Sequence, residues 1–248
     1  MISSFGFFSS SPWMNTSGSL GFVPPAGGWT WPEAAAVFVT NPISFAPRSP
    51  AENRAVLPYP GGFLLHTGLP NPGLRAVIRQ YAVRWARLDI PVWVHLIGEQ
   101  PGELAEMVRK IESLENVQAV EISLPPHAKP EMVHNLVDAG LGELPLLVAV
   151  PLDQYSESWV GNLAFWGASA ITLCAPRGTL VQTNGSRISG RVDGPALLPQ
   201  ALYAIQRLAS QDLPVLAAAG ITTPPDGQAA LNCGATACQV GSALWKIR

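Results

Sequence analysis

The sequence predicts a (β/α)8 barrel that forms a single domain over residues 1–248. From residue 74 onward, short apolar runs alternate with amphipathic stretches, as expected of successive βα units. The apolar runs hold few polar residues, which is typical of parallel strands buried on both faces. The length of 248 residues suits the roughly 250 residues of an eight-unit barrel. An open, doubly wound sheet is the weaker alternative.

Eight strands and six helices follow in order along the chain. The expected strands are a stretch ending at Asn15 and residues 34–40, 90–97, 119–124, 145–151, 170–174, 214–219 and 237–240. The expected helices are residues 73–88, 101–114, 130–139, 156–166, 195–209 and 225–232. Their apolar side chains recur three and four residues apart, and Gly140 stands where a helix C-terminus favours glycine.

Two segments, residues 41–72 and 175–194, are far longer than ordinary strand-to-helix connections. Both follow expected strands, so we expect them as long loops at the C-terminal mouth of the barrel, where active sites are built. Long loops in that position suggest a lid over a ligand. The alternative is that they only cover the barrel and contribute to its packing.

The composition excludes several classes of protein. A hydrophobic content of 48% with only 13% charged residues excludes disorder, and a net charge of -2 gives no electrostatic footprint for nucleic acid. No apolar run is long enough to span a membrane, and the N-terminus lacks the basic region of a signal peptide. Cys174, Cys233 and Cys238 are too few for a disulfide framework. We therefore expect a cytoplasmic protein with neither membrane nor nucleic acid as partner.

Glycines follow the seventh and eighth strands, in Ala219-Gly220-Ile221-Thr222 and Gly241-Ser242-Ala243. Glycine lets backbone N–H groups approach an anion closely, and barrels commonly bind phosphate at these two loops. We therefore expect a small phosphate-bearing ligand here. The alternative is that the glycines only permit tight turns. Nothing in the sequence has the spacing of a metal site.

Several segments resemble dihydroorotate dehydrogenases. Residues 188–197, 213–222 and 232–243 are similar to the C-terminal third of that family, and residues 15–18, 39–48 and 68–73 agree in order. The family is an FMN-dependent barrel that oxidises dihydroorotate to orotate in pyrimidine synthesis, and the resemblance suggests a homodimer or a partner subunit. It implies a flavin ring near Thr16 and Ser17, and a flavin phosphate at Gly190, Gly220, Ile221, Gly241 and Ser242.

The chain departs from the family at the positions that carry its chemistry. The catalytic base falls on Leu124, and the two flavin-site lysines fall on Asn41 and Ala149. Substrate-binding asparagines fall on Leu65, Glu121, Pro126 and Cys174, and the first glycine of the phosphate loop falls on Ala219. Leucine cannot remove a proton, and each unpaired polar group of the substrate would cost about 1–3 kcal/mol. We therefore do not expect dihydroorotate oxidation.

Three functions remain open. The chain is either a dihydroorotate dehydrogenase-like protein that keeps FMN or another phosphate ligand without that catalysis, an active FMN-dependent oxidoreductase on another small substrate, or a non-flavin barrel that binds a phosphate-bearing ligand. His95 and Glu121 lie on neighbouring strands and could form a replacement acid–base pair, with Cys174 at the same mouth. A lone buried histidine is, however, more often a hydrogen-bonded core residue.

Overall fold

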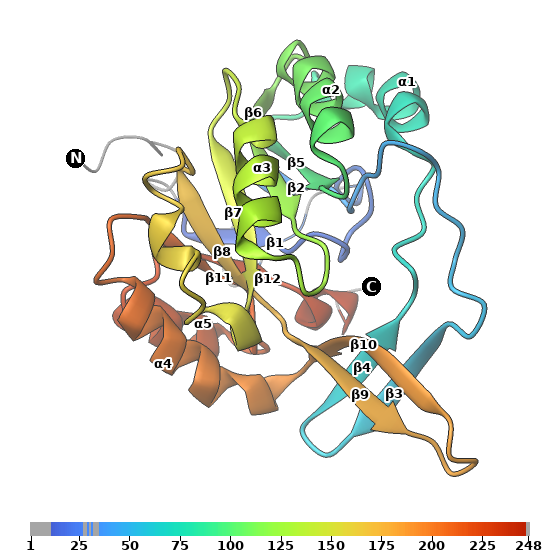
Figure 1. The fold of residues 1–248 in the computed structure, drawn as a ribbon, viewed down its shortest axis with the longest axis vertical. Coiled ribbons are helices and arrows are strands. Elements are labelled where there is room, and N and C mark those ends of the chain that lie inside the picture. Colours follow the sequence, from blue (N-terminus) through green and yellow to red (C-terminus); the bar gives the residue numbers. More distant parts are fainter. Residues whose placement is uncertain (1–10, 27–28, 30, 32–34, 247–248) are drawn as a thin grey trace.

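The computed structural model describes residues 11–26, 29, 31 and 35–246, and its fold is the predicted (β/α)8 barrel (Figure 1). Its eight parallel strands, in spatial order, are β1 (Trp13–Asn15), β12 (Ala237–Val240), β11 (Val215–Ala217), β8 (Ala170–Cys174), β7 (Leu146–Pro151), β6 (Val117–Ser123), β5 (Val92–Ile97) and β2 (Phe38–Val39). Each lies within or close to an expected strand. Residue 34, where the second strand was expected to begin, lies outside the described residues.

The barrel closes between its two edge strands, β1 and β2. A parallel bridge joins Met14 to Val37, beside a hydrogen bond of 2.9 Å from the Ala36 N–H to the Trp13 carbonyl. The fully buried side-chain amide of Asn15 then donates to the Val39 carbonyl (2.7 Å) and accepts from the Val39 N–H (2.8 Å). Beyond the Met14–Val37 bridge, the Asn15 side chain therefore takes the place of backbone pairing between β1 and β2.

Five α-helices surround the described barrel, and four of them begin with proline in the first turn, where its missing N–H costs nothing. They are α1 (Leu74–Trp85), α2 (Pro101–Glu112), α3 (Pro130–Gly140), α4 (Leu198–Leu208) and α5 (Pro224–Asn232). The short 3-10 helix η4 (Pro195–Leu197) precedes α4, and another, η5 (Ser242–Lys246), follows β12. Outward-facing apolar side chains of the strands and the inner faces of the helices share one buried cluster.

The helix expected over residues 156–166 is wrong. Residues 156–166 contain one short 3-10 helix instead, η3 (Val160–Asn162), and another, η2 (Leu152–Gln154), precedes them. Gly161 and Asn162 have low helix propensity and fall in the middle of the expected helix, which explains why only short turns form.

The two long segments expected as loops in fact pair with each other. Strands β3 (Ala55–Tyr59), β4 (Gly62–His66), β10 (Arg187–Asp193) and β9 (Arg177–Val181) form an antiparallel sheet in that order, which projects from the barrel (Figure 1). The register between β4 and β10 aligns Leu65 with Arg191. The sequence pattern missed this sheet because its central pairing joins segments far apart in the chain, and their proline and glycine content is typical of loops.

Inside the barrel, side chains from alternate strand positions stack in layers, because residues two apart in a strand face the same side. The layer at the N-terminal end is apolar and fully buried, and includes Trp93, Ala119, Leu147, Ala170 and Leu216. The next layer toward the mouth contains His95, Glu121, Ala149, Thr172 and Gln239, each two positions further along its strand. The barrel interior is therefore apolar in the layer at its N-terminal end and largely polar in the next layer toward the mouth.

Within the residues that the structure describes, no helix is both long and apolar enough to cross a membrane, and no three His, Cys, Asp or Glu side chains are grouped to hold a metal ion.

Candidate acid–base site in the barrel interior

Glu121 is the centre of a buried polar network in the second layer. Its side chain is 2% exposed, and both carboxylate oxygens accept hydrogen bonds. Oε1 lies 2.6 Å from His95 Nδ1, while Oε2 accepts from the Thr172 hydroxyl (2.5 Å) and from the Gln239 side-chain amide (2.7 Å). Strands β5, β6, β8 and β12 thus each contribute one side chain to the same network.

The network holds Glu121 in its ionised form. Burial alone would raise the pKa of this carboxyl group, but the hydrogen bond and the positive charge of His95, together with the hydrogen bonds from Thr172 and Gln239, outweigh burial and lower the pKa below its ordinary value. An ionised carboxylate only accepts hydrogen bonds, so His95 Nδ1 carries the proton that lies between the two side chains. In the neutral form of the His95 ring, the lone pair is therefore on Nε2.

The free nitrogen of His95 faces accessible space. The His95 side chain keeps 8% of its surface exposed, against 2% for Glu121. Among the described residues, His95 Nε2 has no hydrogen-bond partner, yet it is not one of the fully buried polar atoms that lack one. Because the layer below is fully buried, Nε2 must be reached from the C-terminal mouth.

Cys174 and Arg191 stand closer to the mouth than this pair. Burial and the charge of Glu121 raise the pKa of the Cys174 thiol to about 12, although the nearby charge of Arg191 acts in the opposite direction. Arg191 extends from β10 toward the loop after β1, where its guanidinium lies 3.9 Å from the position that a Cβ would take on Gly18. Within the described chain, Arg191 Nε is buried without a hydrogen-bond partner. The mouth therefore holds a thiol whose pKa is raised and a cation.

The positions that depart from the family carry no replacement base or cation. Leu124 packs, half-buried, against the outer core, and Ala149 is buried inside the barrel. The Asn41 side chain accepts a hydrogen bond of 3.0 Å from the Gly21 N–H. Leu65 lies in β4, and Pro126 is exposed beyond the end of β6. Of the departing positions, Ala149 and Glu121 lie in the second layer of the barrel interior, and Cys174 lies two residues beyond Thr172 on β8.

The expected ring-binding residues make contacts within the protein. Thr16 donates its backbone N–H to the Val240 carbonyl at 2.8 Å, and its methyl group lies 3.0 Å from where a Cβ would stand on Gly241. The buried hydroxyl of Ser17 donates to the Thr40 carbonyl at 2.8 Å. Thr16 therefore borders the loop after β12, and the Ser17 hydroxyl already has a partner.

The expected phosphate-binding residues lie at three places in the fold: in β10, after β11 and after β12. Gly190 lies inside β10, where a Cβ would stand 2.2 Å from the Leu65 carbonyl oxygen, so close strand pairing requires glycine there. Gly220, at φ +76, presses against the start of α4, and Ile221 is buried in the outer core. Gly241 and Ser242 together form the turn after β12.

An acidic side chain lies against the turn after β12, which Gly241 and Ser242 form. The Asp193 carboxylate accepts a hydrogen bond of 2.7 Å from the Gly194 N–H, and the Ser242 hydroxyl donates to it as well. One of its oxygens lies 3.7 Å from the position of a Cβ on Gly241. A phosphate monoester carries between one and two negative charges and would meet this carboxylate directly. The residues present therefore do not fit the phosphate of FMN.

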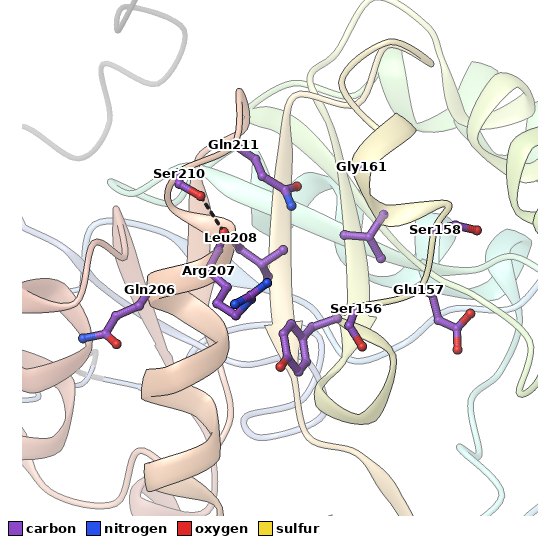
Figure 2. Close-up of a pocket in the computed structure, with 11 residues that line it drawn as sticks. Ser156, Glu157, Ser158, Gly161, Gln206, Arg207, Leu208, Ser210 and Gln211 are labelled. Atoms are coloured by element: carbon purple, nitrogen blue, oxygen red, sulfur yellow. Dashed lines mark hydrogen bonds between the residues drawn. The ribbon is translucent and has the colours of Figure 1, made fainter.

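A separate surface hollow lies on the outside of the barrel, far from this chemistry. It has a volume of about 660 Å³ and lies between η3 and the C-terminal end of α4, lined by residues such as Ser156, Glu157, Arg207 and Gln211 (Figure 2). It opens where the expected helix over residues 156–166 is replaced by short turns. None of the charged groups at this hollow has the buried, multiply bonded setting of Glu121, so we place the candidate site in the barrel.

Comparison with known proteins agrees with the resemblance in the sequence. The catalytic subunit of dihydroorotate dehydrogenase B (NAD(+)) from Pyrococcus furiosus is 29% identical over 268 residues, covering 98% of this chain and 87% of that protein. The Pelobacter propionicus subunit of the same name is 27% identical, covering 94% and 83%. This chain is a distant homologue of dihydroorotate dehydrogenase B catalytic subunits.

The other comparisons are more limited. No family model matches the chain. Among solved structures, FabK from Thermotoga maritima aligns with a TM-score of 0.44 and 20% sequence identity, covering 69% of this chain and 46% of that one. The homology to the two dihydroorotate dehydrogenase B subunits therefore extends over nearly the whole chain and over 87% and 83% of their own lengths.

Sequence reasoning found His95 and Glu121 but missed four residues that define the site. Thr172 and Gln239 complete the network of Glu121, and their inward positions could have been found by counting two residues along each strand from the apolar layer. Arg191 and Asp193 were hidden in a segment expected to be a loop.

Proposed function

We propose that this protein is a dihydroorotate dehydrogenase-like barrel that has lost flavin-dependent oxidation of dihydroorotate and performs acid–base chemistry on a small anion at its mouth. The observation that carries the proposal is the His95–Glu121 pair, with Nδ1 bound to a buried carboxylate at 2.6 Å and Nε2 accessible. The Asp193 carboxylate lies against Gly241 and Ser242, two of the expected phosphate-binding residues, and so disfavours a bound phosphate. We therefore favour acid–base chemistry on a ligand without a phosphate over the three functions that need a phosphate-bearing ligand.

The loss of dihydroorotate oxidation follows from what the side chains can do. Leu124 has no group that can accept a proton, and Ala149 cannot supply a positive charge to an anionic reduced flavin. The polar groups of the substrate would find the hydrocarbon side chain of Leu65 where a hydrogen-bond partner was expected. Several of these losses would have to be compensated together for the oxidation to continue.

The pair has the arrangement of a general base with an orienting carboxylate. Glu121 fixes the His95 tautomer so that the lone pair is on Nε2, and it stabilises the imidazolium that forms when Nε2 takes a proton. Thr172 and Gln239 prevent the carboxylate from rotating, because both donate to the same oxygen. Arg191 supplies positive charge near the mouth, which favours a small substrate with a carboxylate or another negative group.

Two measurements test this function. Purified protein with added FMN and an artificial electron acceptor should not turn over dihydroorotate above the rate without protein, and clear turnover would contradict the proposed loss. Diethylpyrocarbonate reacts with accessible unprotonated imidazole nitrogens, so peptide mapping should find His95 modified alongside His127, which lies on an exposed turn. Modification of His127 with none at His95 would show that Nε2 is closed to the mouth and would exclude it as a base.

The assembly of the protein is a separate proposal. The relatives are named as catalytic subunits, so we propose that this chain also works with a partner subunit or with a second copy of itself. Light scattering of the purified chain distinguishes the two arrangements, because a homodimer would have twice the chain mass of 26.3 kDa.

A further inference from the structure

The loops after β11 and β12 present backbone donors toward the region where a phosphate was expected. In the described part of the chain, the N–H groups of Gly220, Ile221, Gly241 and Ser242 donate to no backbone carbonyl outside their own elements and to no side chain. Free N–H groups of this kind form anion-binding sites in other proteins. We therefore expect these loops to face an anion.

An acidic side chain of the chain itself, Asp193, lies beside the second of these loops, the one after β12. Asp193 ends β10, and its carboxylate is held by the Gly194 N–H on one side and the Ser242 hydroxyl on the other. One carboxylate oxygen lies 3.7 Å from the position that a Cβ would take on Gly241, so the charge stands directly beside the turn after β12. Asp193 also stands directly before η4 and α4, where negative charge is favoured by the helix dipole.

We propose that the Asp193 carboxylate is a built-in substitute for a ligand phosphate, so that this site accepts a phosphate monoester only after the carboxylate is neutralised or removed. This site is separate from His95 and Glu121, and its binding of phosphate does not depend on the proposed acid–base chemistry. Under this proposal, one residue excludes FMN, and the loops after β11 and β12 form a latent phosphate site.

Substitution of Asp193 tests the proposal directly. Asp193→Asn keeps the shape of the side chain but removes its charge, while Asp193→Ser also opens space. Each variant should bind FMN, measured by equilibrium dialysis and by fluorescence of the flavin at pH 7.5, at least about 100-fold more tightly than the original chain. Asp212→Asn is the matched control, because Asp212 is exposed on the turn after α4 and its substitution changes net charge equally.

Riboflavin separates the phosphate from the ring. Because it lacks the phosphate, its binding should not improve in either Asp193 variant, and inorganic phosphate should compete with FMN in both. Stoichiometric FMN binding by the original chain, variants that bind FMN no better than the Asp212→Asn control, or equal gains for riboflavin and FMN would each overturn the proposal.

Acidification gives a second test that needs no substitution. Burial raises the pKa of Asp193 above its ordinary value, against the opposing charge of Arg191 and the hydrogen bonds from Gly194 and Ser242. Tyr59 is the other titratable group that faces it. Lowering the pH from 7.5 through the raised pKa of Asp193 should therefore strengthen FMN binding in the original chain more than in Asp193→Asn, which serves as the baseline for the titration of the phosphate itself. Equal pH dependence in the two proteins would contradict the proposal.

Discussion

Replacement of Glu121 by glutamine should reverse the tautomer of His95. In the original chain, Oε1 accepts the Nδ1–H of His95, and Oε2 accepts from Thr172 and Gln239. Glutamine has one oxygen and one NH2 group, and its oxygen satisfies most donors if it faces Thr172 and Gln239. The NH2 group then faces His95 Nδ1, which must become an acceptor. The ring proton therefore moves to Nε2, and the group that faces the mouth is no longer a base.

The cost of this exchange in stability is modest. Each of the three hydrogen bonds to Glu121 changes from a charged to a neutral one and weakens by about 1 kcal/mol. The neutral side chain also avoids the cost of burying a charge, which offsets part of that loss. We expect Glu121→Gln to lower the free energy of unfolding by about 1–2 kcal/mol at pH 7. Glu121→Leu leaves three buried polar partners unpaired and should lower it by about 3–5 kcal/mol.

Nitrogen NMR of the neutral imidazole ring measures the tautomer, and urea denaturation measures the stability. Since the folded pKa of Glu121 lies below its ordinary value of 4.5, its contribution is complete above that value and is lost as the pH falls through the lowered folded pKa. The stability difference between the original chain and Glu121→Gln should therefore shrink in acid. An unchanged His95 tautomer in Glu121→Gln, or equal stabilities of Glu121→Gln and Glu121→Leu, would refute the reasoning.

Three further predictions concern other parts of the chain. Burial raises the pKa of both Cys174 and Cys238 to about 12, so peptide mapping after iodoacetamide treatment at pH 8 should find both thiols about 1,000-fold slower than an ordinary thiol of pKa 9.0, and rapid alkylation of either contradicts this. Asp226→Ala removes the acceptor of three hydrogen bonds in the first turn of α5 and should lower the free energy of unfolding by about 1 kcal/mol in urea denaturation. Gly220→Ala places a Cβ 2.5 Å from a backbone nitrogen at φ +76 and should cost more than about 2 kcal/mol, whereas Gly102→Ala, with no atom within 4 Å of its Cβ position, should be neutral or stabilising.

The barrel could be predicted from the sequence because its strands are apolar on both faces and its helices have a clear period. The antiparallel sheet could not, because the edge of β4 is satisfied by β10, and no local pattern identifies a partner so distant in the chain. The helix over residues 156–166 failed because apolar spacing was weighted above the low helix propensity of Gly161 and Asn162.

The candidate site was predicted in part. Neighbouring strand positions place His95 opposite Glu121, and this proximity follows from the parallel register alone. The proton on Nδ1 depends on Thr172 and Gln239, which keep the carboxylate ionised, and these two residues come from strands that are not adjacent to that of His95. The position of Asp193 depends on how the end of β10 lies against the turn after β12. No local sequence pattern predicts that arrangement.

The projecting sheet also has a consequence for the order in which the molecule assembles. Its central contact between β4 and β10 includes His66 and Ser189, which are 123 residues apart in the chain, so the closure entropy of that long loop is recovered only after the intervening strands have folded. The sheet is therefore expected to form after the barrel and to exchange its amide hydrogens before the barrel strands do. Arg191 and Asp193 both belong to β10. The positive charge at the mouth and the carboxylate beside the turn after β12 are therefore expected to take their places late in folding and to be displaced when the projecting sheet opens.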